Sequence, residues 1–263
     1  VIPSLDNAYF AAMAAAIEEA ADKQGLATMI TSCGEDPQRL VKALDALMER
    51  QVDGIIAVPL EGAEEALEQA RSYRPLVLID RALGQIPAVL SDPHTGMGQA
   101  VQQLKEKGHT HIGYLSGPQE TSTGRQRLQA FEAATRGLPT HIHHGSYRHR
   151  EGYKGAIALL QEGVTALIAG DSMMTAGALE ACHNAGKRIG EEIALVGFDD
   201  FIYLRFQPSP ISVVDQDVAR MGETATAKLI AAINDKRPPE GEVIETRYIP
   251  RMSTAHQLHG ATP

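Results

Sequence analysis

The stretch Asp53-Gly54-Ile55-Ile56-Ala57-Val58-Pro59 (DGIIAVP) is apolar on both sides of an extended chain. A strand of this composition is typical of a parallel sheet, in which helices cover both faces. A second apolar run follows at Pro75–Asp80 (PLVLID), and a helical pattern near Gly62–Ser72 separates the two runs. This β-α-β succession predicts a parallel α/β sheet.

The same alternation continues along the chain in both directions. Upstream, the pattern predicts a helix over 10–21, a strand near Ala27–Thr31 and a helix through 40–48. Downstream, it predicts helices over 96–107, 125–136, 151–162, 172–185 and 218–234, and strands over 111–116, 140–146, 165–169, 193–198, 211–215 and 243–249. About ten strands exceed what one compact open sheet usually holds. The sequence therefore predicts an α/β fold of two doubly wound parallel-sheet lobes.

Composition excludes several classes of protein. The 263 residues are 43% hydrophobic, which allows a normal core, and the formal net charge of -9 comes without any Lys/Arg cluster. We therefore expect no DNA binding by these residues alone. No apolar run approaches the roughly 18 residues that cross a membrane, and no signal peptide is visible. Cys33 and Cys182 lack metal-ligand spacing and are expected to be reduced thiols.

Polar and aromatic residues follow the predicted strands, where ligands bind in open parallel sheets. They are Ser4, Asp6, Asn7, Tyr9, Phe10, Asp80, Arg81, Thr121, Ser122, Thr123, Arg125, Arg127, Tyr147, Asp171, Asp199, Asp200, Gln216 and Asp217. This mixture suits a polyhydroxylated ligand, because carboxylates accept from neighbouring hydroxyls and guanidinium groups donate in a fixed plane. The chain has no Trp, so aromatic contacts with a sugar ring fall to Tyr9, Phe10 and Tyr147.

Simpler roles stay open for some of these residues. Asp6, Asp171 and Asp217 also suit the N-caps of helices, and Phe10 also suits core packing. Asp199 and Asp200 are a poor catalytic pair, because adjacent side chains in a chain usually point apart.

Enzyme motifs are missing from the sequence. It contains no GxGxxG after a strand, no phosphate-binding loop and no HExxH, and Gly170-Asp171-Ser172-Met173-Met174 lacks the final glycine of a nucleophile elbow. His141, His143 and His144 have no cysteine or second carboxylate group nearby, so solvated histidines are favoured over a metal site. We expect a non-enzyme without cofactor or metal.

Several motifs occur in an order that resembles one family. They are VIPSLDNAYF (1–10), DGIIAVP (53–59), VLIDR (77–81), IGYLSGP (112–118), RLQAF (127–131), AGDSMMTAGAL (169–179), IALVGFDD (193–200) and PSPISVVDQD (208–217). The chain resembles the effector-binding domain of LacI/GalR-type transcriptional regulators, in particular ribose repressors. That domain is similar to periplasmic sugar-binding proteins.

The resemblance implies a periplasmic-binding-protein-like clamp of two lobes joined by three crossings. The expected N-terminal lobe is 1–91 with 218–243, the expected C-terminal lobe is 92–217 with 244–256, and 257–263 is a tail. The family's helix-turn-helix headpiece has no counterpart in these residues, so this chain is not expected to read an operator by itself.

The resemblance also implies roles at matching positions. Asn7 would hydrogen-bond a ring hydroxyl, Tyr9 and Phe10 would sandwich the ring with Tyr147, and hydroxyl contacts would come from Asp80, Arg81, Arg127 and Asp199. Gln216 lies where the chain returns between lobes, and Thr123 matches a position that touches ligand in some relatives. The sequence departs from the family at Gly170, where an asparagine often contacts ligand, and at Ala130, where the family has glycine.

The function implied is that of the effector-sensing domain of a cytoplasmic repressor. A sugar would bind in the interlobe cleft, and ribose or a similar monosaccharide is favoured. Closure of the two lobes on the sugar would change the arrangement of the headpieces in a homodimer. Operator DNA would be reached only through that headpiece, and no membrane partner is expected. A periplasmic sugar receptor of a transporter is the alternative, although the motifs at 112–118 and 208–217 favour a regulator.

Overall fold

The computed structural model of the protein describes residues 1–236 and 238–257. The chain forms two compact units, each assembled from two separate stretches of sequence. The first unit comprises Val1–Ser91 with Asp217–Ile244, and the second comprises Asp92–Gln216 with the described chain from Glu245 onward.

Two unit boundaries differ by one residue from those expected. Asp217 and Ile244 group with the first unit. Asp217 caps the helix that follows it, and Ile244 is part of a strand in the first unit's sheet. The tail expected at 257–263 lies, apart from Gln257, outside the described residues.

Among the described residues, the first unit holds a four-stranded sheet in the order β1-β2-β3-β9. Its strands are β1 (Ile55–Ala57), β2 (Leu76–Ile79), β3 (Ala88–Asp92) and β9 (Glu242–Glu245). Strands β1, β2 and β3 are parallel. The helices of this unit are α1 (Ala8–Asp22), α2 (Pro37–Glu49), α3 (Glu64–Tyr73) and α9 (Val218–Asp235).

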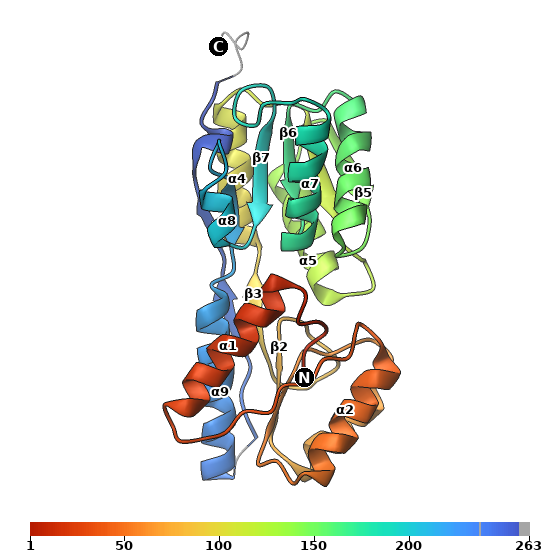
Figure 1. Ribbon diagram of the computed structural model, residues 1–263, viewed down its shortest axis with the longest axis vertical. Coiled ribbons are helices and arrows are strands. Elements are labelled where there is room, and N and C mark those ends of the chain that lie inside the picture. Colours follow the sequence, from red (N-terminus) through yellow and green to blue (C-terminus); the bar gives the residue numbers. More distant parts are fainter. Residues whose placement is uncertain (237, 258–263) are drawn as a thin grey trace. The chain divides into compact units, whose positions relative to one another are not determined.

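Helices cover this sheet because its strands are apolar on both faces. Leu76 and Leu78 of β2 pack in one core with Leu40 of α2 and Leu67 of α3. Helix α9 packs on β1 and β2 and lies beside α1, as Figure 1 shows. The helices that join the strands therefore bury a sheet whose carboxyl edge carries the candidate ligand residues.

The part of the second unit that the structure describes holds a six-stranded sheet in the order β10-β8-β7-β6-β4-β5. Its strands are β4 (Ile112–Ser116), β5 (Thr140–His144), β6 (Ala166–Ala169), β7 (Ala194–Phe198), β8 (Ser212–Asp215) and β10 (Arg247–Ile249). All neighbouring strands are parallel except β10, which runs antiparallel to β8 at the edge. The helical segments are α4 (His94–Glu106), α5 (Ser122–Ala134), α6 (His149–Gln161), α7 (Ser172–Asn184), α8 (Ile202–Arg205) and η1 (Met252–Thr254).

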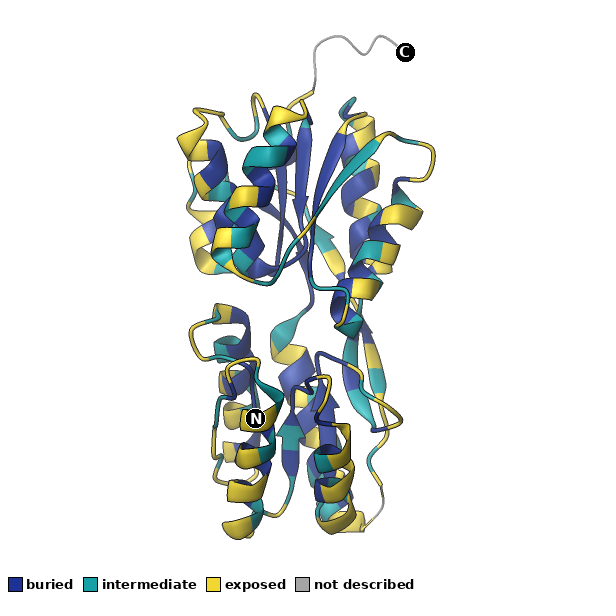
Figure 2. Cartoon of the chain, turned by 90° about the vertical axis from the view of Figure 1, so that its right-hand side faces the viewer, coloured by how far each residue is buried: buried dark blue, intermediate teal, exposed yellow. Residues whose placement is uncertain are grey.

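Side chains alternate between two cores across this sheet. Leu115 and Leu167 pack with α6 and α7, whereas Tyr114 and Ile168 pack with α4 and α5. Figure 2 shows the result, with buried strands between helices that expose only their outer faces. The predicted fold class, an α/β fold with two parallel sheets, is confirmed.

The sequence prediction was wrong in two places. No strand forms at Ala27–Thr31. In the part of the chain that the structure describes, the nearest bridge is an isolated parallel one between Ile2 and Ser32, one residue beyond this range. The single strand expected at 243–249 is divided into β9 and β10, which belong to different sheets. Thr246 separates them, because its backbone N–H and its hydroxyl both donate to the Asp92 carbonyl, at 3.0 and 2.8 Å.

Candidate functional site

Equivalent aspartates end a central strand in each unit. Asp80 directly follows β2 and Asp199 directly follows β7, and each is only 4% exposed. Both have positive φ, 71° and 64°, a conformation that residues other than glycine rarely adopt. Backbone of this kind is kept mainly at functional positions. The two residues therefore mark the carboxyl edge of each sheet as a candidate site.

In the first unit, Asp80 is held by Tyr9. The Tyr9 hydroxyl donates to Asp80 Oδ1 at 2.8 Å, and both side chains are buried. Asn7 places this tyrosine, because its Oδ1 accepts from the Tyr9 backbone N–H at 3.0 Å and so caps α1. Phe10 packs edge-on against Tyr9 and is buried, in agreement with the core role left open for it.

Arg81 has a partner that sequence reasoning missed. Its two terminal nitrogens donate to the two carboxylate oxygens of Glu35, both at 2.8 Å, and its guanidinium lies 5.8 Å from the centre of the Phe10 ring. Glu35 lies in a loop with φ of 56°, outside any periodic pattern. Arg81 is thus fixed by an ion pair within its own unit.

In the second unit, three expected residues form a continuous hydrogen-bonded chain. Arg127 of α5 donates to the Gly170 carbonyl at 2.8 Å and to Gln216 Oε1 at 2.9 Å. Gln216 Nε2 in turn donates to Asp199 Oδ1 at 2.7 Å. All three side chains are buried. This series of hydrogen bonds, the Arg127–Gln216–Asp199 chain, joins helix α5 to the residues that follow β7 and β8, which are far apart in the sequence.

The environment of Arg127 and Asp199 is largely apolar. The Arg127 guanidinium lies 4.2 Å from the centre of the Phe198 ring, a cation–π contact. Burial raises the pKa of the Asp199 carboxyl to about 7, although Arg127 and the hydrogen bond from Gln216 lower it. The nearby carboxylates of Asp171 and Asp215 raise it further. Asp199 therefore titrates in the neutral range.

Tyr147 and Thr123 lie next to this chain. Tyr147 Oη donates to Thr123 Oγ1 at 3.2 Å, and the Arg127 guanidinium is 5.7 Å from the Tyr147 ring centre. The ring packs directly on Gly117, where an added Cβ would lie 2.2 Å from a ring carbon. The second unit thus brings together Thr123, Arg127, Tyr147, Asp199 and Gln216, all of which the sequence analysis proposed.

Two of the aspartates for which an N-cap role was left open, Asp171 and Asp217, do cap helices. Asp171 Oδ1 accepts from the Met174 N–H at 2.7 Å, and Asp217 Oδ1 accepts from the Arg220 N–H at 3.3 Å. Asp6 caps no helix, since Asn7 holds that position on α1. Gly170 leaves no room for the family's asparagine, because an added Cβ would lie 2.5 Å from the Leu115 carbonyl oxygen.

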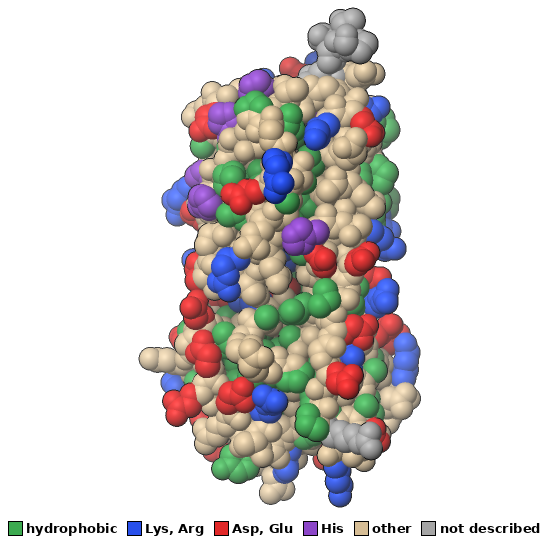
Figure 3. All heavy atoms as spheres, turned by 180° about the vertical axis from the view of Figure 1, so that it is seen from behind, with side chains coloured by type: hydrophobic (Ala, Val, Ile, Leu, Met, Phe, Trp, Pro, Cys, Tyr) green, Lys and Arg blue, Asp and Glu red, His purple; other side chains and the backbone are tan. Residues whose placement is uncertain are grey.

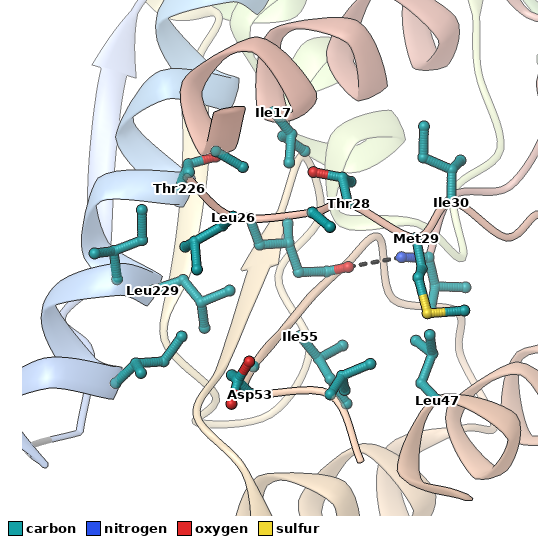
Figure 4. A pocket seen from close by; sticks show the side chains of 18 of the residues that line it. Ile17, Leu26, Thr28, Met29, Ile30, Leu47, Asp53, Ile55, Thr226 and Leu229 are labelled. Carbon is teal, nitrogen blue, oxygen red and sulfur yellow. Dashed lines mark hydrogen bonds between the residues drawn. The ribbon is translucent and has the colours of Figure 1, made fainter. Parts of the chain in front are cut away.

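A cavity of about 340 Å³ in the first unit lies away from these residues. Its lining is mostly apolar and includes Ile17, Leu26, Met29, Leu47 and Leu229, as Figure 4 shows. None of the proposed ligand residues lines it. A mostly apolar lining offers few hydrogen-bond partners for the hydroxyls of a sugar, so we do not assign the effector to this cavity.

Metal-binding clusters and membrane-spanning helices are absent from the described part of the chain. No three metal-binding side chains cluster there, and His141 pairs with Glu162 at 2.5 Å. No helix within residues 1–236 and 238–257 is long and apolar enough to span a bilayer. On the face in Figure 3, acidic and basic side chains are interspersed, and no continuous basic patch is visible there.

Comparison with known proteins identifies relatives that match most of the chain. The family model of the periplasmic binding protein-like domain matches residues 101–254. The crystal structure of a probable LacI family transcriptional regulator from Corynebacterium glutamicum is 41% identical, with a TM-score of 0.90 and 96% of each chain covered. A putative ribose operon repressor from Burkholderia thailandensis is 32% identical, with a TM-score of 0.83, 94% of this chain and 97% of that chain covered. The repressor PurR of Mannheimia succiniciproducens is 28% identical over 90% of this chain and 74% of its own length.

Proposed function

The chain belongs to the LacI family of transcriptional regulators, as an effector-binding domain and not an enzyme, and from this premise we propose that it binds a neutral monosaccharide. Ribose is the sugar we favour. The proposed ligand residues are those that the sequence analysis named: Asn7, Tyr9, Phe10, Asp80, Arg81, Thr123, Arg127, Tyr147, Asp199 and Gln216.

The Arg127–Gln216–Asp199 chain is the observation that carries the proposal. It places a donor group, an amide and a carboxylate in a buried setting, where hydrogen bonds are stronger than in water. A sugar hydroxyl both donates and accepts, so it can bond to the carboxylate and to the guanidinium without adding charge. The aromatic ring of Tyr147 beside this chain offers an apolar face to the C–H groups of a sugar.

Ribose is favoured by two independent considerations. The pattern of Asn7, Asp80, Arg81 and Arg127 resembles that of pentose-binding relatives. The relative from Burkholderia thailandensis, which is 32% identical over nearly the whole chain, is described as a ribose operon repressor. The Tyr9–Asp80 pair and the Arg81–Glu35 pair hold two of these side chains in place.

In the proposed mechanism the sugar selects one conformation of the domain. It shifts the balance between conformations only by its difference in affinity for them. We propose that the domain acts as a homodimer of a cytoplasmic repressor, since a pair of operator half-sites requires a pair of headpieces. Operator DNA is contacted only through a headpiece outside these residues, in keeping with the net charge of -9.

A thermal-shift screen followed by calorimetry tests this function. The probes are D-ribose, other pentoses, hexoses, their phosphates, nucleosides and purines. We expect D-ribose or a close relative to stabilise the wild-type protein, and Arg127→Ala to lose most of that affinity while remaining folded. Arg125→Ala is the matched control, because Arg125 lies on the same helix but is exposed and bonds only to the Gln119 and Glu120 carbonyls. Equal affinity in both variants counts against the site.

A periplasmic sugar receptor is the second candidate. It shares the fold, but the similarity of nearly the whole chain to regulators favours the repressor. A dimer in solution supports the regulator, whereas a strict monomer that binds sugar tightly supports the receptor.

A further inference from the structure

Glu35, the partner of Arg81, is held in place by the loop that carries it. Before it, the Gly34 N–H donates to the Pro3 carbonyl at 2.7 Å, and after it, Asp36 caps α2. Glu35 itself has φ of 56°, a conformation that residues other than glycine rarely adopt and that is kept mainly at functional positions. The loop therefore fixes the carboxylate beside Arg81.

The ion pair joins a buried arginine to a partly exposed glutamate. The Arg81 side chain is 4% exposed, whereas that of Glu35 is 43% exposed. Solvent and solutes therefore reach the pair from the side of the glutamate. Apolar residues of similar size often replace a buried ion pair without loss of stability, so packing and stability alone do not account for this pair.

Glu35 occupies the face of the Arg81 guanidinium with which arginine binds anions. Arginine recognises a carboxylate or a phosphate through two parallel N–H···O bonds, and the two terminal nitrogens of Arg81 make these bonds to Glu35, both at 2.8 Å. Asp80 brings a second carboxylate to the same arginine, since its Oδ2 lies 3.6 Å from Arg81 Nε. An anionic group at this position would meet two negative charges and one positive charge.

The arginine of the second unit is engaged in a similar way by its own unit. Arg127 donates to the Gly170 carbonyl and to the side chain of Gln216. Carboxyl groups lie close to it, since both Arg127 and Asp171 act electrostatically on Asp199. In each unit, the arginine among the proposed ligand residues therefore already has an acceptor from the protein and a carboxyl group nearby. An arrangement of this kind suits hydroxyl groups better than a further anion.

We propose that Glu35 is a specificity-determining residue of the effector site, whose carboxylate occupies the anion-binding face of Arg81 and so excludes effectors that carry a phosphate or carboxylate group. This inference rests on the proposed function, and it assigns the selection of neutral sugars over sugar phosphates to one residue. A phosphate must compete with Glu35 for the same donors, which is discrimination by repulsion of the wrong ligand. A neutral sugar is not repelled, because its hydroxyls carry no charge and can donate to carboxylates.

The ratio of two affinities tests the proposal. Calorimetry measures the binding of D-ribose and of D-ribose 5-phosphate by the wild-type protein and by Glu35→Gln. We expect the wild-type protein to bind ribose at least about 100-fold more tightly than the phosphate, because like charges placed side by side are costly. In Glu35→Gln this ratio should fall at least about tenfold, since the phosphate no longer competes with a carboxylate for Arg81. An unchanged ratio overturns the proposal, as does equal binding of both compounds by the wild-type protein.

Two further variants make the result specific to the Glu35 carboxylate. Asp36→Asn removes the same charge from the next residue, and its ratio should equal that of the wild-type protein. Asp36 bonds to backbone N–H groups of α2, and asparagine caps helices as well as aspartate does. Glu35→Ala removes the carboxylate altogether and should lower the ratio as Glu35→Gln does. A fall of equal size in Asp36→Asn overturns the proposal, because the effect would then belong to the charge of the loop as a whole.

The two proposals fail in different ways. If the wild-type protein binds neither compound nor any other sugar, the proposed function fails and the role of Glu35 falls with it. If the wild-type protein binds ribose, and Glu35→Gln weakens the binding of ribose and of its phosphate by the same factor, the proposed function stands. Glu35 then only positions Arg81, and its role in specificity is overturned.

Discussion

Nε2 of Gln216 donates a 2.7 Å hydrogen bond to Oδ1 of Asp199, and both side chains are buried at the carboxyl edge of the second sheet. The orientation of this amide is determined by Arg127, which donates to its oxygen at 2.9 Å. The amide therefore fixes where the carboxylate of Asp199 can face, without neutralising it. This relay is a fixed array of donors and acceptors for a hydroxylated ligand.

Gln216→Leu should remove that relay while keeping most of the buried volume. We expect affinity for the effector to fall at least about tenfold, because the variant leaves the buried Arg127 and Asp199 each without one hydrogen bond. Calorimetry measures the change, with Gln207→Leu as the control, since Gln207 bonds only to the carbonyl of Tyr203. Similar affinities in the two variants would show that the relay does not hold the ligand.

Stability should depend on the protonation of Asp199. Its folded-state pKa, about 7, lies above the ordinary aspartate value of 3.8, so the folded state binds the proton more tightly than the unfolded state. This contribution to stability is fully present below about pH 4 and is lost as pH rises through 7. Each unit of pKa difference corresponds to about 1.4 kcal/mol. Compared with Asp199→Asn, the wild-type protein should therefore lose unfolding free energy between about pH 5 and pH 8 in urea titrations.

Ligand affinity should change with pH in the opposite direction. If the charged carboxylate accepts hydrogen bonds from the sugar, affinity rises as pH increases towards about 7 and levels off above it. Calorimetry of the wild-type protein at several pH values measures this. A flat profile would indicate that Asp199 is not a ligand acceptor.

Substitution of Gly170 should lower the stability of the protein more than substitution of a glycine that has free space beside its Cα. We expect Gly170→Ala to destabilise the protein by about 1–3 kcal/mol, because its Cβ meets a backbone oxygen at 2.5 Å. Gly98 of α4 is the control, since nothing lies within 4 Å of a Cβ added there, and Gly98→Ala should stabilise the helix by up to about 1 kcal/mol. Urea unfolding compares the two, and equal effects would contradict the close approach at Gly170.

Exposed apolar side chains on the second unit should mediate the proposed dimer. Ile202, Phe206 and Met252 are 61%, 78% and 60% exposed. Asp200 pairs with both Arg205 and Arg251, which links the segments that carry these side chains. Apolar side chains that gather on one exposed surface mark interfaces. Phe206→Glu should yield a monomer by light scattering at micromolar concentration, whereas Tyr73→Glu, at an exposed residue of the first unit, should leave the dimer intact.

Much of the architecture follows from local sequence signals. Apolar runs such as those at 55–57 and 194–198 formed strands, and the helices between them formed with ends shifted by a few residues. The segment 27–31 has strand-like composition, but it pairs with no strand among the described residues, and Ile2 bonds only to the carbonyl of Thr31 at its end. Strand formation depends on pairing as well as on residue type.

Part of the site could be predicted because strand ends meet at one edge of a sheet. This rule brings Asp199 and Gln216 to one edge, whereas Arg127, which lies inside α5, was singled out by the resemblance to the family. The rule could not identify Glu35, whose pairing with Arg81 depends on how a loop folds back.

The most direct test of the central claim is calorimetry of the wild-type protein with D-ribose at a pH of about 7.5, where Asp199 is mostly charged, repeated with Asp199→Ala and Asp80→Ala. We predict saturable binding at one site per chain by the wild-type protein. We also predict at least about a tenfold loss of affinity in each variant, because each substitution removes a carboxylate that accepts hydrogen bonds from the sugar. Saturable binding that neither substitution weakens would contradict the claim, and so would the absence of binding by the wild-type protein to any sugar tested.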